Sequence, residues 1–333
     1  MGTNLQALYR LMLRSRRFEE AVTSLWEAGK ISGEMHLGVG EEAIVAGVVA
    51  HLQDGDAMAL DHRGTPPLVM RGVDLALLLK EFLGRSDGLC KGMGGHMHLF
   101  SAQHLAASSG IVGSSGPLAA GFALAAQYLH PGNVSVAFFG DGASNQGMLL
   151  ESFNLASAWQ LPLIFICKDN TWAITTQSPG VTGGNIIDRA RAFGLIAAEV
   201  DGSDVEAVHS AAGRMIERAR DGDGPSFLLA RCPRLEGHFL GDPLRRANML
   251  ELAGPLMAAF VAQPGAPVAE RAYSLGTLLS LVGKTTVEKN WKRHDPVVKA
   301  RRKLQSQKAG LDTLEKEVEA EIRLVLETAM MET

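Results

Sequence analysis

Unbroken apolar runs alternate with helix-spaced apolar positions through the middle of the chain. Residues 134–140 and 162–170 are apolar runs of strand length, and residues 145–160 between them have helical spacing. Such runs are typical of parallel strands that are buried on both faces, and strand, helix, strand in about 30 residues is a βαβ unit. Helix and strand patterns then alternate again, at 188–194, 197–202, 205–221 and 225–232. The chain is therefore predicted to be an α/β protein with a doubly wound parallel sheet and helices on both faces.

The two ends of the chain carry amphipathic helical patterns. Residues 5–28 have helical periodicity, and Gly29 follows as a stop. Further along, residues 251–284 are rich in Ala, Gly, Pro and Leu and have weak periodicity. We predict an α/β domain over residues 1–250 and a C-terminal helical extension over residues 251–333. The apolar face of the last helix is formed by Leu311, Leu314, Val318, Ile322 and Val325.

Composition narrows the class of protein. The chain is 46% hydrophobic and 20% charged, as expected for a packed globular protein. The net charge of -4, with no basic run beside aromatic residues, gives no sign of nucleic-acid binding. No stretch reaches the ~20 apolar residues that span a bilayer, and Arg and Glu interrupt the N-terminal pattern, unlike a signal peptide. Three cysteines without metal-ligand spacing are typical of a reducing compartment, so we expect a cytoplasmic protein.

Two oxygen-bearing side chains follow neighbouring strand patterns. Asp141 comes directly after the first apolar run, and Asn170 ends the second. Ligands bind at the carboxyl ends of strands in open α/β sheets, so both side chains are predicted to enter one crevice, where their oxygens suit Mg²⁺. Gly140 and Gly142 allow close approach of a ligand, and a helix beginning near Asn145 favours a diphosphate at its N-terminus. An Asp-Gly turn alone is common, so the prediction depends on Asn170 as well.

The residues around this pair resemble a known family. The stretch GDGASNQG, followed by FNLASAWQLPLIFICKDNTWAITT, is similar to the thiamine-diphosphate motif of the α subunits of 2-oxo-acid and acetoin dehydrogenase complexes. The resemblance extends from about Leu5 to Arg246, and residues 251–284 form an apparent insertion relative to that family. It implies the thiamine-diphosphate-binding fold. It also implies that Mg²⁺ is held by Asp141, Asn170 and the main-chain carbonyl of Trp172.

Three further segments, DHRG, GIVG and PRLEGHFLGDP, match the same family. The cofactor contacts that the resemblance implies are His62, Arg63, Gly110, Val112, Asp141, Gly142, Ala143, Asn170, Arg234 and His238. Arg63 suits a diphosphate because its planar guanidinium pairs with phosphate oxygens. His238 is the candidate catalytic residue, for proton transfer or for stabilising a charged intermediate.

The resemblance also implies an activity and partners. Such α subunits bind thiamine diphosphate and Mg²⁺, decarboxylate a 2-oxo acid such as pyruvate or cleave acetoin, and pass the acyl group to a lipoyl-bearing acyltransferase. A glutamate on a separate β subunit completes the site, so an α₂β₂ heterotetramer is expected. Thr65 stands where many members have a histidine, which leaves the substrate and the acyl acceptor open. A transketolase-like split thiamine enzyme, or a cofactor-binding α subunit with altered or lost turnover, are the alternatives.

Overall fold

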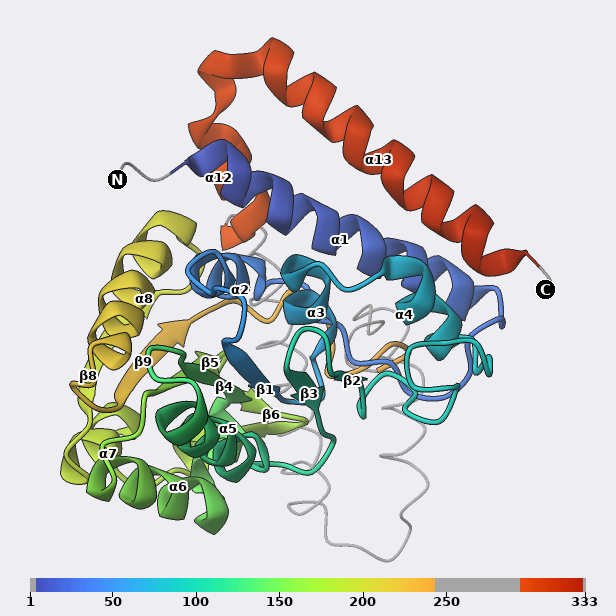
Figure 1. The fold of residues 1–333 in the computed structure, drawn as a ribbon. Coiled ribbons are helices and arrows are strands. Elements are labelled where there is room, and N and C mark those ends of the chain that lie inside the picture. Colours follow the sequence, from blue (N-terminus) through green and yellow to red (C-terminus); the bar gives the residue numbers. More distant parts are fainter. Residues whose placement is uncertain (1–3, 243–293, 332–333) are drawn as a thin grey trace, which may run out of the picture.

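The computed structural model describes residues 4–242 and 294–331 (Figure 1). In this part of the chain, seven strands form one sheet in the order β2-β3-β1-β4-β5-β9-β8. Neighbouring strands are parallel, except that β2 pairs antiparallel with β3. The bounds are β1 Ala57–Leu60, β2 Phe100–Ser101, β3 Ala106–Ser108, β4 Ser135–Gly140, β5 Leu163–Asp169, β8 Ile196–Asp201 and β9 Ser226–Arg231. A separate hairpin after β5 consists of β6 Trp172–Ala173 and β7 Thr176–Gln177.

Helices cover both faces of this sheet (Figure 1). One face carries α5 Ser115–Leu129, α6 Gly147–Ala158 and α7 Ile186–Ala192. On the other side lie α1 Leu5–Glu27, α2 Glu42–Val49, α3 Thr65–Arg71, α4 Leu75–Phe82, α8 Val205–Arg220 and α12 Pro296–Lys303, and α13 Lys308–Met330 packs outside α1 and α4. Among the described residues, no helix is both long and apolar enough to cross a membrane. The doubly wound parallel sheet with helices on both faces is therefore confirmed.

Each central strand sends alternate side chains to the two helical layers. In β4, Val136 and Phe138 join the apolar cluster formed with α1, α2 and α8. Ala137 and Phe139 join the opposite cluster, with α5 and α6. Because side chains alternate along a strand, burial on both faces requires an unbroken apolar run. Full burial of each phenylalanine contributes about 1.5–3 kcal/mol, so these strands form the centre of the fold.

The structure contains elements that the sequence patterns did not predict. Helix α3 begins at Thr65, and Pro66 lies in its first turn, where the missing N–H of proline loses no hydrogen bond. The strands β2, β3, β6 and β7 have two or three residues each, too few to show a period. The helix predicted to begin near Asn145 starts at Gly147 instead, after a 3₁₀ turn over Asp141–Asn145.

The C-terminal helix α13 packs along α1 and α4 (Figure 1). Its predicted apolar face is confirmed, since four of the five residues are buried in the α1 cluster and Val325 packs against it. Ion pairs from Arg10 to Glu317 and from Arg14 to Glu321, each at 2.6 Å, join the same two helices. The apparent insertion at 251–284 lies outside the described residues, and the division at residue 250 stays a prediction.

The N-terminus of α8 offers a test of local stability. Asp204 is the N-cap, and its Oδ1 accepts hydrogen bonds from the N–H groups of Glu206 and Ala207. Asp204→Ala is expected to cost about 1 kcal/mol, a melting-temperature decrease of about 1–2 °C for a chain of this size. Asp204→Asn keeps a capping oxygen and is expected to lose less. Asp221→Ala, at the other end of α8, is the control, because a carboxylate there opposes the helix dipole.

Candidate active site

A cavity of about 650 Å³ opens at the carboxyl edge of the sheet. It lies between β1 and β4. The chain places β3 on one side of β1 and then β4 on the other side, so the strand order reverses at this point. Such switch points are the usual ligand sites of open α/β sheets. Every candidate residue except Arg234 lines it: His62, Arg63, Gly110, Val112, Asp141, Gly142, Ala143, Asn170, Trp172 and His238.

Asp141 and Asn170 meet in this cavity because β4 and β5 are adjacent and parallel. Each residue directly follows its strand. The Asp141 carboxyl is buried and accepts a hydrogen bond from Ser178 Oγ. Burial raises the pKa of Asp141 to about 6, although the Ser178 hydrogen bond acts in the opposite direction. Among the described residues, no Lys or Arg forms an ion pair with Asp141.

The chain after Asn170 folds back over the cavity. Thr171 has a φ of 66°, in the left-handed region, and Asn170 Oδ1 accepts the Trp172 N–H at 3.1 Å. This turn brings the β6–β7 hairpin against the Asp141 loop. A Cβ added to Gly142 would lie 2.6 Å from Ala173 Cβ. Only glycine therefore fits at position 142, and the predicted ligand Trp172 lies next to Asp141 and Asn170 in the cavity wall.

His62 and Arg63 follow β1 on the other side of the cavity. Arg63 donates hydrogen bonds to the carbonyls of Leu37 and, at 3.0 Å, His238. Its Nε lies 3.8 Å from Glu41 Oε1. A guanidinium has five N–H groups, so these contacts do not exhaust its donors. The Nε2 atom of His62 is buried and has no hydrogen-bond partner among residues 4–242 and 294–331.

The GIVG segment lies beyond β3, at the mouth of the same cavity. Gly110 is half-buried, whereas Ile111 and Val112 are 62% and 51% exposed. Ser109 Oγ accepts the Ile111 N–H at 3.1 Å, which fixes the turn. The segment therefore presents main chain to the cavity and two apolar side chains to its mouth.

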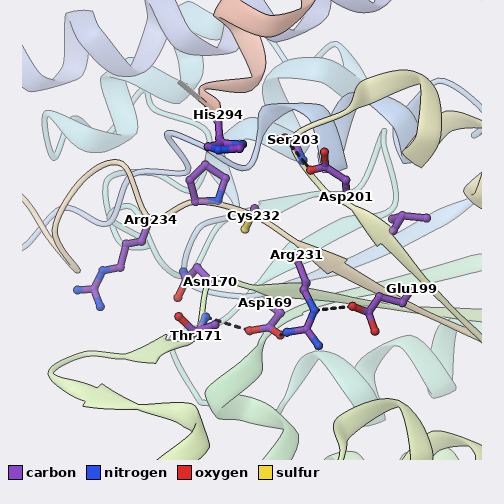
Figure 2. Close-up of a pocket in the computed structure, with 12 residues that line it drawn as sticks. Asp169, Asn170, Thr171, Glu199, Asp201, Ser203, Arg231, Cys232, Arg234 and His294 are labelled. Carbon is purple, nitrogen blue, oxygen red and sulfur yellow. Dashed lines mark hydrogen bonds and ion pairs between the residues drawn. The ribbon is translucent and has the colours of Figure 1, made fainter. Parts of the chain in front are cut away.

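Arg234 lines a neighbouring cavity of about 520 Å³ at the carboxyl ends of β5, β8 and β9 (Figure 2). Its guanidinium lies 5.9 Å from the centroid of the Trp172 ring, and Nη1 donates to the Ile174 carbonyl at 2.7 Å. Asn170 lines both cavities. Arg234 thus contacts the hairpin that carries Trp172, and its predicted contact with a diphosphate stays a prediction.

Three histidines, His36, His62 and His238, line the larger cavity, and a fourth, His96, stacks against His36. The ring of His36 lies 4.7 Å from those of His62 and His238, centroid to centroid. His36 Nδ1 and His96 Nε2 share a hydrogen bond of 2.8 Å. Burial, then neighbouring cationic groups including Arg63, lowers the pKa of His238 to about 4. His238 is therefore neutral near pH 7, and a weaker base than a free imidazole.

The sequence patterns did not predict a buried charge network that reaches the cavity wall through Glu41 and Asp61. Lys168 on β5 is fully buried, and its Nζ lies 2.6 Å from Glu41 Oε2 and 3.1 Å from Asp61 Oδ1. Asp61 Oδ1 also accepts the Arg63 N–H at 3.1 Å. A lysine within an apolar strand is the signal that was available, because buried lysines need a charged partner.

Known proteins resemble this chain over the same region. A family model described as "Dehydrogenase E1 component" matches residues 10–251. The α subunit of acetoin:2,6-dichlorophenolindophenol oxidoreductase from Cupriavidus necator is 44% identical over 240 residues, 72% of each chain. Its namesake from Bacillus subtilis is 44% identical over 237 residues, 71% of each chain.

A second group of relatives is named for another substrate, pyruvate. The pyruvate dehydrogenase E1 component subunit alpha of Rhizobium meliloti is 41% identical over 239 residues, which is 71% of this chain and 69% of the relative. Both groups therefore match at similar levels of identity and coverage. The chain belongs to the dehydrogenase E1 component family, as an α subunit of the acetoin and pyruvate dehydrogenase type.

Proposed function

We propose that this α subunit binds thiamine diphosphate through Mg²⁺ and acts, with a β subunit, on acetoin or a 2-oxo acid such as pyruvate. The observation that carries the proposal is the pairing of Asp141 and Asn170 in one cavity, at the switch point of the sheet. The acetoin and pyruvate relatives support this reaction over that of a transketolase-like enzyme.

The donor set fits the cofactor and its metal. Asp141, Asn170 and the carbonyl of Trp172 offer three oxygen ligands of the kind Mg²⁺ prefers. Across the cavity, Arg63 and His62 supply N–H donors for a diphosphate. Gly142, Ala143, Gly110, Val112, Arg234 and His238 complete the proposed contacts. When bound, thiamine diphosphate supplies the electron sink for breaking a bond to a carbonyl carbon.

The histidines are the residues of this chain that are proposed to transfer protons in the reaction. His238 lies in the cavity, and the Asp242 carboxylate accepts its main-chain N–H at 2.8 Å, which fixes the loop. A neutral imidazole there can take a proton from the substrate and return it. Thr65 is buried in α3 and is not among the residues that line the cavity. Substrate contacts are therefore expected from His238 and its neighbours.

The partner follows from the family. The relatives are named as α subunits, so this chain is expected to work with a β subunit, in an α₂β₂ assembly whose β chain contributes a glutamate to the site. The acyl group would then pass to a lipoyl-bearing acyltransferase. The apolar side chains of Ile111 and Val112 at the cavity mouth are suited to lie against such a subunit.

The test is an activity assay on the chain co-expressed with its β subunit. Reduction of 2,6-dichlorophenolindophenol would be followed with acetoin or pyruvate as the only substrate. Activity is expected to require both thiamine diphosphate and Mg²⁺, and the ratio of kcat/KM values identifies the substrate. An assembled complex that binds the cofactor but reduces the dye with neither substrate would contradict the proposed reaction.

A substitution of His238 tests its catalytic role. His238→Asn is expected to lower kcat about 100-fold, near the lower end for loss of a general acid or base. The affinity for thiamine diphosphate should change less than threefold, on the order of 0.6 kcal/mol. His130→Asn is a matched control, because His130 caps α5 on the surface. Equal kcat values for His238→Asn and the wild type would show that His238 does not transfer the proton.

A further inference from the structure

We propose that His36, His62 and His238 form a binding site for a borderline transition-metal cation such as Zn²⁺, separate from the Asp141–Asn170 pair and inhibitory to the enzyme. One ring nitrogen of each histidine lies within 4.8 Å of the others. All three residues line the cavity that holds the proposed cofactor site. A cation bound there would take His62 away from the diphosphate and would occupy the part of the cavity where His238 is expected to meet the substrate.

The geometry is close to that of a zinc site with three protein ligands. With Zn–N distances of about 2.0–2.1 Å, ligand nitrogens around a tetrahedral Zn²⁺ lie about 3.4 Å apart. From a separation of 4.8 Å, each nitrogen needs to move inward by roughly 0.8 Å, which side-chain rotation provides. The cavity leaves the fourth position open to water or an anion. This is the arrangement of an open site, unlike a closed structural one.

The hydrogen bonds of the histidines are compatible with a metal. His36 Nδ1 and His96 Nε2 share a hydrogen bond of 2.8 Å. In the tautomer in which His36 donates its Nδ1–H, His36 Nε2 is the ligand atom, and His96 is the partner that fixes the ring orientation, as metal-binding histidines usually require. His62 Nε2 is buried without a hydrogen-bond partner in the described part of the chain. A buried imidazole nitrogen in this state gains from ligating a cation.

The charges around the cluster allow a divalent cation. Arg63, Lys168 and Arg234 oppose it, because their positive charges act on the histidine rings. The carboxylates of Glu34 and Asp141 line the same cavity and favour it. Glu41 and Asp61 are already paired with Lys168. Imidazole ligands select zinc, cobalt, nickel or copper over magnesium, so the cluster and the Asp141–Asn170 pair are expected to take different metals.

The test uses Co²⁺ as a spectroscopic probe on the full chain, purified with its β subunit and freed of metal and cofactor with a chelator. Wild-type protein is expected to bind one Co²⁺ with the intense visible absorption of a tetrahedral nitrogen-ligated ion, and Zn²⁺ should displace it. X-ray absorption should show three imidazole ligands, a readout that needs no variant. A weak octahedral spectrum, or no binding, would overturn the proposal.

Variants assign the ligands. His62→Ala and His238→Ala are each expected to weaken Co²⁺ binding by more than about 100-fold, and His96→Phe by about 10–100-fold, as for loss of a supporting residue. His98→Ala, an exposed histidine of the same loop, is the matched control and should bind normally. Asp141→Ala should also retain the cobalt spectrum. Loss of the cobalt spectrum in Asp141→Ala, or its persistence in His62→Ala, would place the cation elsewhere.

The inhibition is measured separately, on the active complex. Zn²⁺ is expected to lower activity at concentrations that displace Co²⁺, EDTA should restore it, and excess Mg²⁺ should not. Full activity with the cluster saturated by Zn²⁺ would overturn the inhibitory part of the proposal. Because the cobalt titration contains neither cofactor nor substrate, its outcome does not depend on the proposed function.

Discussion

Replacing Asp141 with alanine is expected to weaken binding of thiamine diphosphate by about 1000-fold, close to 4 kcal/mol. Asp141 is the one charged group among the three proposed oxygen ligands, and its carboxylate is 1% exposed. Without it, Mg²⁺ loses charge compensation and the diphosphate loses its main cation. Supporting residues of metal sites already account for 10–100-fold in affinity, so a charged ligand should account for more. Calorimetric titration of the assembled complex, with and without Mg²⁺, measures the change.

Thermal stability separates loss of the site from loss of the fold. With the cofactor at 100 times its Kd, binding adds about 2.7 kcal/mol to the wild type, a shift of about 4 °C for a chain of this size. The Asp141→Ala variant should lose this shift. Without cofactor, its melting temperature should be no lower than that of the wild type, because burial already disfavours the carboxylate. Asp188→Ala, an exposed carboxylate on α7, is the control. Magnesium-dependent binding that survives in Asp141→Ala would refute the proposed metal site.

The sequence predicted the sheet because its central strands are buried on both faces. Residues 134–140 and 162–170 cannot be amphipathic when each side chain packs against one helical layer or the other. The short elements were not predicted, because they carry no such pattern. The two-residue strands β2, β6 and β7 are too short to show a period. Pro66 obscured the start of α3, although proline is well tolerated in a first helical turn.

The site also contains residues that the sequence predicted and residues that it did not. Asp141 and Asn170 were predictable because a βαβ unit places two strand ends side by side. The histidine cluster was not, since His36 and His96 come from loops whose paths no local pattern determines. Arg234 lines the neighbouring cavity in the structure, which a match to a loop motif did not indicate.

Replacing Lys168 with methionine is expected to destabilise the fold by about 3–5 kcal/mol, because it leaves the carboxylates of Glu41 and Asp61 buried without their cation. For a chain of this size, the melting temperature should fall by about 4–7 °C. The loss of stability relative to the wild type should become smaller as the pH is lowered from 8 to 5. Carboxylates that have lost their cation have raised pKa values in the folded state, so they take up protons and cease to oppose folding.

A double substitution separates charge from packing. If the buried charges cause the loss, adding Glu41→Gln to Lys168→Met should recover part of it, with a coupling of roughly 0.5–3 kcal/mol between the two sites. Lys303→Met is the matched control, since Lys303 is 38% exposed and its ion pair with Glu206, at 2.7 Å, is expected to contribute at most about 1 kcal/mol. Additive losses at Lys168 and Glu41 would mean that the lysine acts through its packing. Because Asp61 pairs with Lys168 and also accepts the Arg63 N–H, the Lys168→Met substitution is expected to lower cofactor affinity as well.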